Sequence, residues 1–418
     1  MRAVSQDRPV VIPPSSLKVP SFGPVVNQGS PGHVLSLVRS GLANTRPALA
    51  RLTGISRSAV AMRVESLAEA GLVIEDGSAA STGGRRATYL RFAEGSGMVL
   101  VADLGTTVAR LAVTDLAGAP LATRAAEQSM SAGPTEYLEW MADHLEDLLQ
   151  EAGRHPHHVR GVGVGLPGPV EHATGRVIVP PSMPGWDDFP VAETLQSRFG
   201  VEVVVDNDVN IMAWGEYTAL WRHEVANILF IKVADAGIGS GIVTSGRIHH
   251  GAQGSAGAIG HIRVPGYEDT VCRCGNTGCL GTAVGGGALA ARLRGLGHHV
   301  VDGKAVAELA LAGDLDAVQE IRACGRALGE VLAGIVNFFN PDVIVVGGVI
   351  VRAHEQLLAG LREIVYQRCL PLATRALRLV PSGLGDDAGV LGAAAMTIDR
   401  VMSPAAVDEL VSSAESAG

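Results

Sequence analysis

The alternation of apolar and polar residues predicts three short helices and then two strands in the first hundred residues. An apolar stripe that begins after His33 ends at Gly41, a second helical segment covers Thr45–Leu52, and a third begins at Ser56. Threonine and serine are favoured N-caps, and a glycine follows each segment as a stop signal. The runs LVIE and ATYLRF have strand character, and a polar tip, DGSAASTGGRR, separates them. Three helices and a hairpin outline a winged helix-turn-helix, which we assign to residues 31–95.

A different pattern begins near Met98, where strand-like runs alternate with glycine turns and amphipathic helices. The strand-like runs are VLVADLG, ARLAVTDLAG, RGVGVGLPG, VEVVVDNDVN, ANILFIKVADAGIGSGIVTSG and DVIVVGG. Repeated strand, turn and helix units predict a largely three-layer α/β body. We divide this body into a first lobe, residues 96–215, and a second lobe, residues 216–400. Residues 401–418 are assigned to a C-terminal tail, either a short helix or a frayed end.

Composition then bounds the class of protein. The chain has 418 residues, a net charge of −9, 47% hydrophobic residues and 18% charged residues, which excludes a disordered or coiled-coil protein. Residues 1–30 hold five of the 21 prolines and no apolar period, which predicts a flexible or extended arm. The start of the chain lacks the apolar core of a signal peptide, and polar residues interrupt the apolar run 331–351. We therefore expect a soluble cytoplasmic protein without a membrane segment.

The acidic total conceals a basic segment. Residues 1–95 contain 11 Lys and Arg against six Asp and Glu, a net charge of +5, so the remaining 323 residues sum to −14. Arginine and serine side chains at the start of a recognition helix suit contacts with double-stranded DNA, and arginines on a hairpin tip suit phosphates or the minor groove. The candidate DNA contacts are Ser56, Arg57, Ser58, Arg63, Arg85 and Arg86. The alternative is a winged helix used for protein contacts, with its arginines on a solvated face.

Three of the five cysteines lie within eight residues, in CRCGNTGC, and His261 precedes them. Three thiolates and one imidazole form a closed tetrahedral shell of the structural zinc type. An odd number of cysteines so grouped suits a reducing compartment better than a disulfide framework. The predicted ligands are His261, Cys272, Cys274 and Cys279. The alternative is four unrelated buried side chains, which is how we interpret Cys324 and Cys369.

Two further segments indicate phosphate and carboxylate chemistry. The turn Asp103-Leu-Gly105-Thr106-Thr107 follows a strand, and its amides and hydroxyls suit a phosphate, although any glycine-rich turn looks similar. In VVVDNDVN, Asp208 follows a buried strand and is placed to act as general base on a sugar hydroxyl, with Asn207 beside it. The alternative is that Asp208 only caps a helix that starts at Val209.

Taken together, these stretches resemble the ROK family of repressors, open reading frames and sugar kinases. The matching pieces are DLGTT, GVGVGLPG, DNDVN, GAIGH, CRCGNTGCL and NPDVIVVGG, between about residues 97 and 400. With the winged helix and its TGGRR tip, the chain resembles the transcriptional-repressor branch. The resemblance implies a two-lobed actin-like/hexokinase body of the ribonuclease H-like kind, with sugar and nucleotide bound between the lobes.

The resemblance also implies roles for single residues. The histidine and three cysteines match the family's zinc ligands, and Asn207 and Asp208 match the sugar contact and the base of the kinases. Gly165, Pro167 and Gly168 match the loop that borders the sugar, and we expect an effector to bind near Gly165, Gly168, Asn207, Asp208 and His261.

Three positions depart from the family pattern. Ala258 and Gly281 stand where the family has glutamates that accept hydrogen bonds from sugar hydroxyls, and Val108 stands where the kinases have a lysine. We therefore expect Asp208 to be a vestigial catalytic residue and the kinase activity to be lost.

The leading hypothesis is a homo-oligomeric, DNA-binding regulator, a repressor of carbohydrate-related genes with a sugar-like effector and a structural zinc. A homodimer or a homotetramer would suit a palindromic operator. The second hypothesis is an ATP-dependent sugar kinase with an accessory DNA-binding head. A third is a regulator without an effector, in which the body serves only for assembly.

Overall fold

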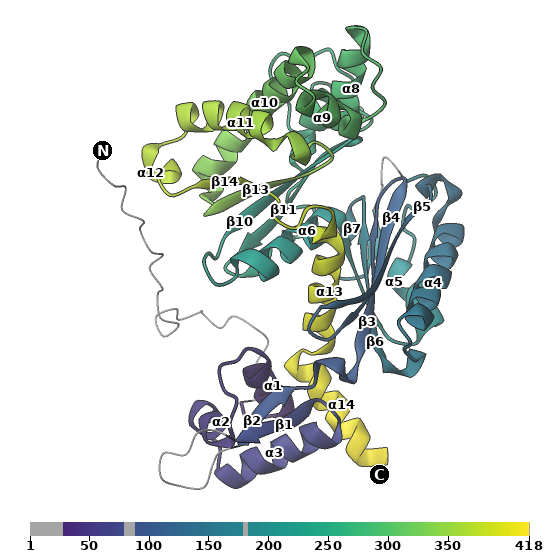
Figure 1. Cartoon of the computed structure of the whole chain (residues 1–418), viewed down its shortest axis with the longest axis vertical. Coiled ribbons are helices and arrows are strands. Elements are labelled where there is room, and N and C mark those ends of the chain that lie inside the picture. Colours follow the sequence, from purple (N-terminus) through teal and green to yellow (C-terminus); the bar gives the residue numbers. More distant parts are fainter. Residues whose placement is uncertain (1–27, 79–87, 179–182, 418) are drawn as a thin grey trace. The chain divides into compact units, whose positions relative to one another are not determined.

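The structure is a computed structural model that describes residues 28–78, 88–178 and 183–417. The chain forms two compact units (Figure 1). One, which we call the head, contains the chain up to Phe92 together with Pro404–Gly418. The other, which we call the body, is Ala93–Ser403. The predicted arm falls almost wholly outside the described residues.

The head contains the three helices and the hairpin that the sequence predicts. Its elements are α1 (Pro31–Arg39), α2 (Arg46–Thr53), α3 (Arg57–Glu69), β1 (Val73–Ser78), β2 (Thr88–Phe92) and α14 (Pro404–Ala417). Ser30, Thr45 and Ser56 cap the first three helices through their side-chain oxygens. Strands β1 and β2 pair antiparallel, and the amide of Leu90 also donates to the carbonyl oxygen of Asn44. Local capping hydrogen bonds therefore mark where these three helices begin.

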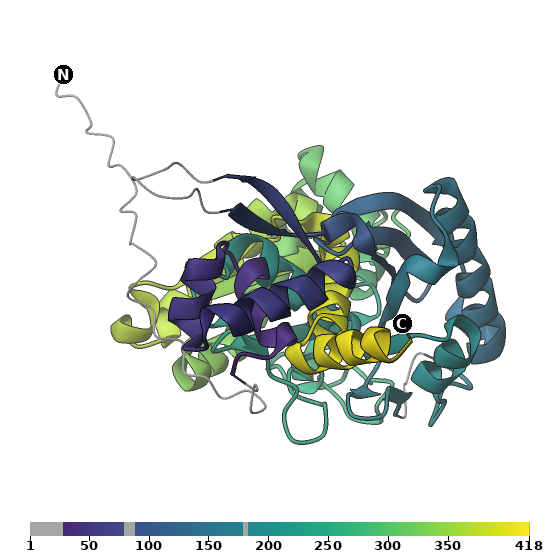
Figure 2. The same cartoon turned by 90° about the horizontal axis from the view of Figure 1, so that it is seen from below.

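The C-terminal residues belong to the head, where they form a helix rather than a frayed tail. Helix α14 packs on α1, and Figure 2 shows it, in yellow, beside the purple helices of the head. The amide of Gly32, in the first turn of α1, donates to Asp408 Oδ1 at 2.7 Å. A Cβ atom at Gly32 would lie 2.0 Å from the carbonyl oxygen of Pro404, so only glycine permits this approach. The assignment of 401–418 to a separate tail is thus corrected by a contact between the two ends of the chain.

The body contains two five-stranded sheets with the same topology. The first has the order β5-β4-β3-β6-β9 and the second the order β12-β11-β10-β13-β14. In each, the first three strands of the sheet in sequence form an antiparallel meander, and two further strands add in parallel to the first. Strands of the first sheet are β3 (Met98–Leu104), β4 (Val108–Asp115), β5 (Pro120–Glu127), β6 (Val159–Leu166) and β9 (Glu202–Asn207). Strands of the second are β10 (Ile228–Ala234), β11 (Gly237–Thr244), β12 (Arg247–Ile248), β13 (Val343–Gly348) and β14 (Arg378–Pro381).

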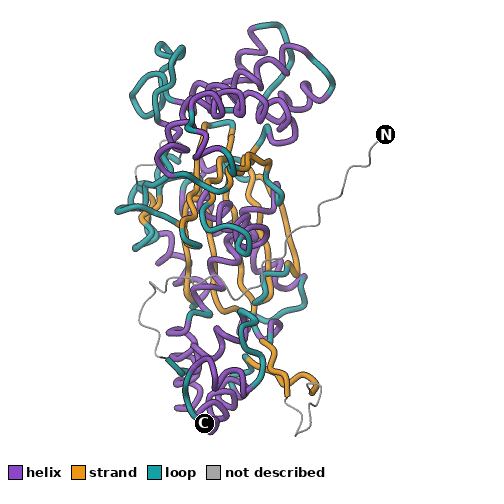
Figure 3. The backbone as a smooth tube through the Cα atoms, turned by 90° about the vertical axis from the view of Figure 1, so that its left-hand side faces the viewer, coloured by secondary structure: helices purple, strands orange, loops and turns teal. Residues whose placement is uncertain are grey.

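Helices flank both sheets, as the tube in Figure 3 shows. The first sheet packs against α4 and α5 on one side and α13 on the other, and the second packs against α6 and, on its far side, a larger group of helices. The helices of the body are α4 (Pro134–Glu151), α5 (Val191–Phe199), α6 (Asp208–Glu216), α7 (Leu280–Val284), α8 (Gly286–Gly295), α9 (Gly303–Leu311), α10 (Leu315–Phe339), α11 (His354–Arg368), α12 (Pro371–Thr374) and α13 (Ala388–Val401). A short hairpin, β7 (Val170–Glu171) and β8 (Arg176–Val177), follows β6. The two-lobed α/β fold is therefore confirmed.

Helices α6 and α13 cross in contact at the centre of the body. A Cβ atom at Gly392 would lie 1.7 Å from the carbonyl oxygen of Ile211, and one at Gly215 would lie 2.3 Å from that of Ala388. Because α13 packs on β3 and β6, residues 388–400 complete the first sheet's packing, although we assigned them to the second lobe. Among the described helices none spans a membrane by itself, and only the bent pair 385–401 and 404–414 has sufficient combined length and apolar character.

Candidate functional site

The head carries a helix-turn-helix in α2 and α3. Gly54 ends α2 in the left-handed conformation with φ at 73°, and Ser56 then caps α3 by accepting from the amide of Ala59 at 3.1 Å. A short glycine-containing turn between two packed helices is the arrangement of DNA-binding helix-turn-helix motifs. Arg57 is the first residue of α3, and its side chain is exposed. This exposure leaves Arg57 available to a duplex.

The other predicted DNA contacts differ in their surroundings. Ser58 is exposed, and its Oγ lies 2.9 Å from Ser56 Oγ. Arg63 is half-buried, and its Nε donates to the carbonyl oxygen of Gly29 at 3.4 Å, so part of this side chain is used inside the head. Arg85 and Arg86 lie outside the described residues.

The inclusion of α14 changes the net charge of the head. The head has 11 Lys and Arg against eight Asp and Glu, three of them in Pro404–Gly418, so its net charge is +3. The body carries the remaining net charge of −12. The contrast between a basic head and an acidic body survives with a smaller positive charge on the head.

The four predicted metal ligands converge in the second half of the body. The ligand atoms of His261, Cys272, Cys274 and Cys279 all lie within 4.8 Å of one another. Cys274 Sγ lies 3.8 Å from Cys279 Sγ, and Cys272 Sγ lies 3.8 Å from His261 Nδ1. A tetrahedral zinc with Zn–S bonds of ~2.3 Å has S···S edges of ~3.8 Å. The cluster therefore has the size of a zinc site.

Backbone hydrogen bonds hold this cluster in a compact loop. The amide of Val264 donates to Gly278 O at 2.8 Å, and that of Leu280 donates to Ile262 O at 2.9 Å. Gly275 and Gly278 have positive φ angles of 89° and 72°, which allow the tight turns between the ligands. Cys324 and Cys369 are buried elsewhere in the body, as expected for plain core residues.

The segments expected to carry phosphate and carboxylate chemistry also meet. Asp208, in the first turn of α6, is buried, and its Oδ2 lies 2.5 Å from Lys232 Nζ on β10. Asp103, at the end of β3, is also buried and interacts electrostatically with both residues. Burial alone would lower the pKa of Lys232, but the carboxylates of Asp208 and Asp103 hold it above its usual value. Asp208 is thus ion-paired with a lysine.

Burial is also the main influence on Asp103, and it raises the pKa of this carboxyl group to about 6 from 3.8. Lys232 and Arg110 oppose this shift, whereas Asp208 and Asp386 add to it. Asp103 Oδ1 is buried and has no hydrogen-bond partner among the described residues. Asp103 is therefore protonated over a wider pH range in the folded protein than an aspartate in water.

A pH dependence of stability follows. Between about pH 4 and pH 6 the folded state holds a proton on Asp103 that the unfolded chain has released, so this contribution to stability is full below pH 4 and is lost as the pH rises through 6. We expect the free energy of unfolding of Asp103→Asn to rise by about 2–3 kcal/mol relative to that of the wild type between pH 4 and pH 7. Denaturant unfolding of both proteins across this pH range measures the difference between their unfolding free energies. A difference that does not change with pH would contradict the expectation.

The glycine turn after Asp103 is the connection between β3 and β4. The amide of Gly105 donates to Val108 O at 2.9 Å, and a Cβ atom at Gly105 would lie 2.5 Å from that oxygen. Thr106 is half-buried and Thr107 is exposed. Val108 leaves the turn without the cationic side chain of the kinase pattern.

Three of the expected sugar-site positions lie beside Asp208. Asn207 Nδ2 donates to Gly168 O at 2.9 Å, and a Cβ atom at Gly165 would lie 3.5 Å from Asp208 Cα. Asn207 Oδ1 accepts from the amide of Val209, so Asn207, and not Asp208, caps the helix, which begins one residue earlier than expected. Much of the amide side chain of Asn207 is therefore engaged within the protein. His261 lies in the cysteine cluster, and its role toward an effector stays a prediction.

The two positions that lack glutamate differ in their surroundings, since Gly281 lies against closely packed backbone and Ala258 is exposed. A Cβ atom at Gly281 would lie 3.0 Å from the amide nitrogen of Ile238 and 3.2 Å from Gly237 Cα. Ala258 immediately precedes the 3-10 turn Ile259–His261 that leads to the metal cluster. Restoring a glutamate at position 281 would therefore require β11 to move.

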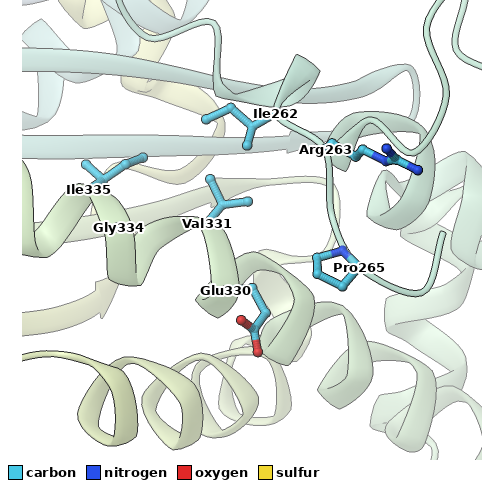
Figure 4. A pocket seen from close by; sticks show the side chains of 7 residues that line it. All are labelled: Ile262, Arg263, Pro265, Glu330, Val331, Gly334 and Ile335. Atoms are coloured by element: carbon cyan, nitrogen blue, oxygen red, sulfur yellow. The ribbon is translucent and has the colours of Figure 1, made fainter. Parts of the chain in front are cut away.

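A separate groove of about 410 Å³ lies beside the metal-cluster loop (Figure 4). Residues of the loop after His261 form one side, and one face of α10 forms the other. Its lining is mostly apolar and comprises Ile262, Arg263, Pro265, Glu330, Val331, Gly334 and Ile335.

Sequence reasoning missed several groups, among them Lys232 and two clusters of metal-ligand side chains, one of which is His298, Asp314 and Asp316. Lys232 stands as the one charged residue in the apolar run ILFIKVA, and that interruption was the available signal. His172, Asp206 and His250 also come together, but 78 residues separate the two histidines, and no local spacing reveals the cluster.

Comparison with known proteins gives a consistent result. The sequence model of the ROK family matches residues 99–400. The xylose repressor of Caldicellulosiruptor bescii is 28% identical over 384 residues, which cover 88% of this chain and 95% of that protein. The glucokinase of Halalkalibacterium halodurans is 32% identical over 308 residues, which cover 69% of this chain and 92% of that protein.

A solved structure described as a ROK family transcriptional regulator, a homologue of the E. coli MLC protein, has a TM-score of 0.77 and 25% identity. It covers 91% of this chain and 98% of its own. The ROK hexokinase from Thermus thermophilus has a TM-score of 0.60 and 31% identity, and covers 73% of this chain and 99% of its own. The regulators thus match more of the chain than the sugar kinases do.

Proposed function

The chain belongs to the ROK family, in its repressor branch, and on this premise we propose that it is a DNA-binding transcriptional repressor of sugar-related genes. The observation that carries the proposal is a helix-turn-helix head attached to a ROK body. Relatives that align over both parts bear the names of repressors or regulators. The glucokinase and the hexokinase align over a share close to that of the body alone.

In this proposal α3 reads the major groove and the hairpin β1–β2 lies against the adjacent backbone. A recognition helix presents its N-terminal residues to base edges, which is where Arg57 stands. The protein would act in the cytoplasm as a homodimer or homotetramer on a roughly palindromic operator, because two-fold protein symmetry matches a two-fold site.

Arg57→Ala is expected to weaken operator binding by about 10–100-fold, since a bidentate arginine–guanine contact contributes about 1–3 kcal/mol. The measurement is a gel-shift or anisotropy titration at fixed salt. Arg375→Ala is the matched control, because it removes the same charge from an exposed position in the body. Equal affinities of the wild type and Arg57→Ala would reject α3 as the recognition helix.

We further propose that a sugar or sugar derivative binds near Gly165, Gly168, Asn207, Asp208 and His261 and changes the affinity for DNA. An effector can shift an equilibrium only by its differential affinity for the two states. A structural Zn²⁺ bound by His261, Cys272, Cys274 and Cys279 would hold the loop that contains His261, and so support this region. Binding to the chain's own upstream DNA, repeated with a panel of sugars, tests the effector.

Sugar kinase activity is the competing function, since Asp103 and Asp208 are present and glucokinases are among the relatives. The Lys232–Asp208 ion pair and the residues Ala258, Gly281 and Val108 oppose it. We expect no ADP release above background from hexoses or N-acetylhexosamines with ATP in a coupled assay. Turnover that Asp208→Asn abolishes would establish the kinase instead, whereas turnover that this substitution leaves unchanged would indicate a contaminant.

A further inference from the structure

A second cluster of metal-ligand side chains lies in the body, apart from the cysteines. The ligand atoms of His172, Asp206 and His250 all lie within 4.8 Å of one another. His250 Nε2 lies 2.6 Å from Asp206 Oδ2, and His172 Nδ1 lies 3.6 Å from the same oxygen. Two imidazole nitrogens therefore meet at one carboxylate oxygen.

Two hydrogen bonds hold the carboxylate of Asp206 in place on the side away from the histidines. Its side chain is 2% exposed, and its other oxygen, Oδ1, accepts from the amide of Asn207 at 2.7 Å and from Asn210 Nδ2 at 2.8 Å. These two hydrogen bonds fix the orientation of the carboxylate and leave Oδ2 to the two histidines. Outer hydrogen bonds of this kind orient the ligands of metal sites in proteins.

The two imidazole rings are held together as well. They stack with centroids 3.9 Å apart and an angle of 16° between their planes. Imidazole nitrogens and carboxylate oxygens are common metal ligands in proteins.

The distances suit a metal ion after small movements. With metal–ligand bonds of ~2.0–2.2 Å, ligand atoms at the corners of an octahedron or a tetrahedron lie ~3–3.5 Å apart. The 3.6 Å separation of His172 and Asp206 is close to this range, and the 2.6 Å separation of His250 and Asp206 has to open by less than 1 Å. We propose that His172, Asp206 and His250 form a second divalent metal site, separate from the cysteine cluster.

The ligand set indicates the class of metal. Two imidazoles and one carboxylate suit zinc and its first-row neighbours, whereas magnesium and calcium prefer sites made of oxygen ligands. Three protein ligands leave further positions for water, and His172 lies on the exposed side of the cluster. The site would therefore exchange its metal with solvent more readily than a closed four-ligand site.

The ligands come from three segments of the body. His172 follows β7, Asp206 lies in β9 of the first sheet, and His250 follows β12 of the second sheet. A metal ion would tie the loop after β12 to the strand that carries Asn207. Metal binding would in this way restrain the two sheets beside the proposed effector residues.

The test is a zinc titration of untagged protein whose cysteine site is already filled. The parent protein carries His157→Ala and His158→Ala, because the exposed rings of His155, His157 and His158 lie together and would take up zinc themselves. We compare this parent with His172→Ala and His250→Ala in the same background. His249→Ala is the control, since it removes a neighbouring exposed imidazole.

Calorimetry and elemental analysis are expected to give one zinc per chain beyond the cysteine-bound metal in the parent and in His249→Ala. The affinity for this additional zinc should fall at least about tenfold in His172→Ala and in His250→Ala. Cobalt as the probe adds a check, because cobalt bound by His172, Asp206 and His250 has no cysteine ligand and should give no thiolate-to-cobalt absorption band.

Two results would overturn the proposal. One is a parent protein that takes up no second equivalent, which would make the cluster a hydrogen-bonded His–Asp–His group. The other is an additional zinc whose affinity neither histidine variant alters. Circular dichroism and retention of the cysteine-bound zinc show whether each variant is folded.

Discussion

Gly392→Ala is expected to lower the free energy of unfolding of the body by about 4 kcal/mol or more. The new Cβ atom would lie 1.7 Å from the carbonyl oxygen of Ile211, in the backbone of α6. No change of rotamer relieves this clash, because both partners are fixed to helix backbones, and a second close approach, between Gly215 and the carbonyl oxygen of Ala388, holds the same two helices together. Helices α6 and α13 would have to separate, and overpacking of a close contact is strongly destabilising.

Tryptophan fluorescence during denaturant or thermal unfolding measures this effect in the body alone, because all four tryptophans lie within Ala93–Ser403. A loss of this size corresponds to a Tm decrease of about 10 °C. Gly334→Ala is the matched control, since Gly334 lies in the interior of α10 and its added Cβ atom would meet nothing within 4 Å. The unfolding free energy of that control should rise by about 0.5–1 kcal/mol, because alanine has a higher helix propensity than glycine. Unchanged stability of Gly392→Ala would show that the two helices are not tightly apposed.

Loss of the cysteine cluster should have an effect of similar size. Cys279→Ser is expected to abolish tightly bound zinc, from about one per chain to none, and to lower the unfolding free energy by more than about 4 kcal/mol. A structural metal adds its binding free energy to folding, and Cys279 is only 1% exposed, so the substitution would lose this contribution and place a serine hydroxyl at a buried position.

Elemental analysis of freshly purified protein, passed over a chelating resin to remove weakly held metal, gives the stoichiometry. Cys369→Ser is the control, because this buried cysteine lies outside the cluster, with its Sγ directed to Ala333 O. It should keep its zinc. A wild-type protein without zinc would refute the metal assignment.

Local signals explain what the sequence predicted well. Thr45 and Ser56 were predicted as caps, and both cap their helices through short-range hydrogen bonds. Ser30 caps α1 in the same way but was not predicted. The cysteine cluster was also predictable, because three of its ligands lie within eight residues, a spacing typical of a metal site. Roles of the DNA and effector residues remain proposals.

Long-range pairings explain what was missed. The packing of α13 on the first sheet and of α14 on α1 depends on contacts across hundreds of residues, which periodicity does not encode. Lys232 could be recognised as a site residue only from the fold, in which β10 places its Nζ 2.5 Å from Asp208 Oδ2. His172 and His250 likewise acquired a common partner only through the fold.

The contact between α1 and α14 has a consequence for the order of events on the ribosome. The first three helices are synthesised long before Pro404–Ala417, because the 311 residues of the body lie between them. Domains usually fold as they emerge, but Asp408 cannot reach the amide of Gly32 until the body has been translated. A nascent chain could therefore form α1, α2 and α3 early, but α1 would gain its contact with α14 only at the end, and a chain truncated before Pro404 would lack this part of the head's packing. Packing of the head is therefore complete only after Pro404–Ala417 has been translated.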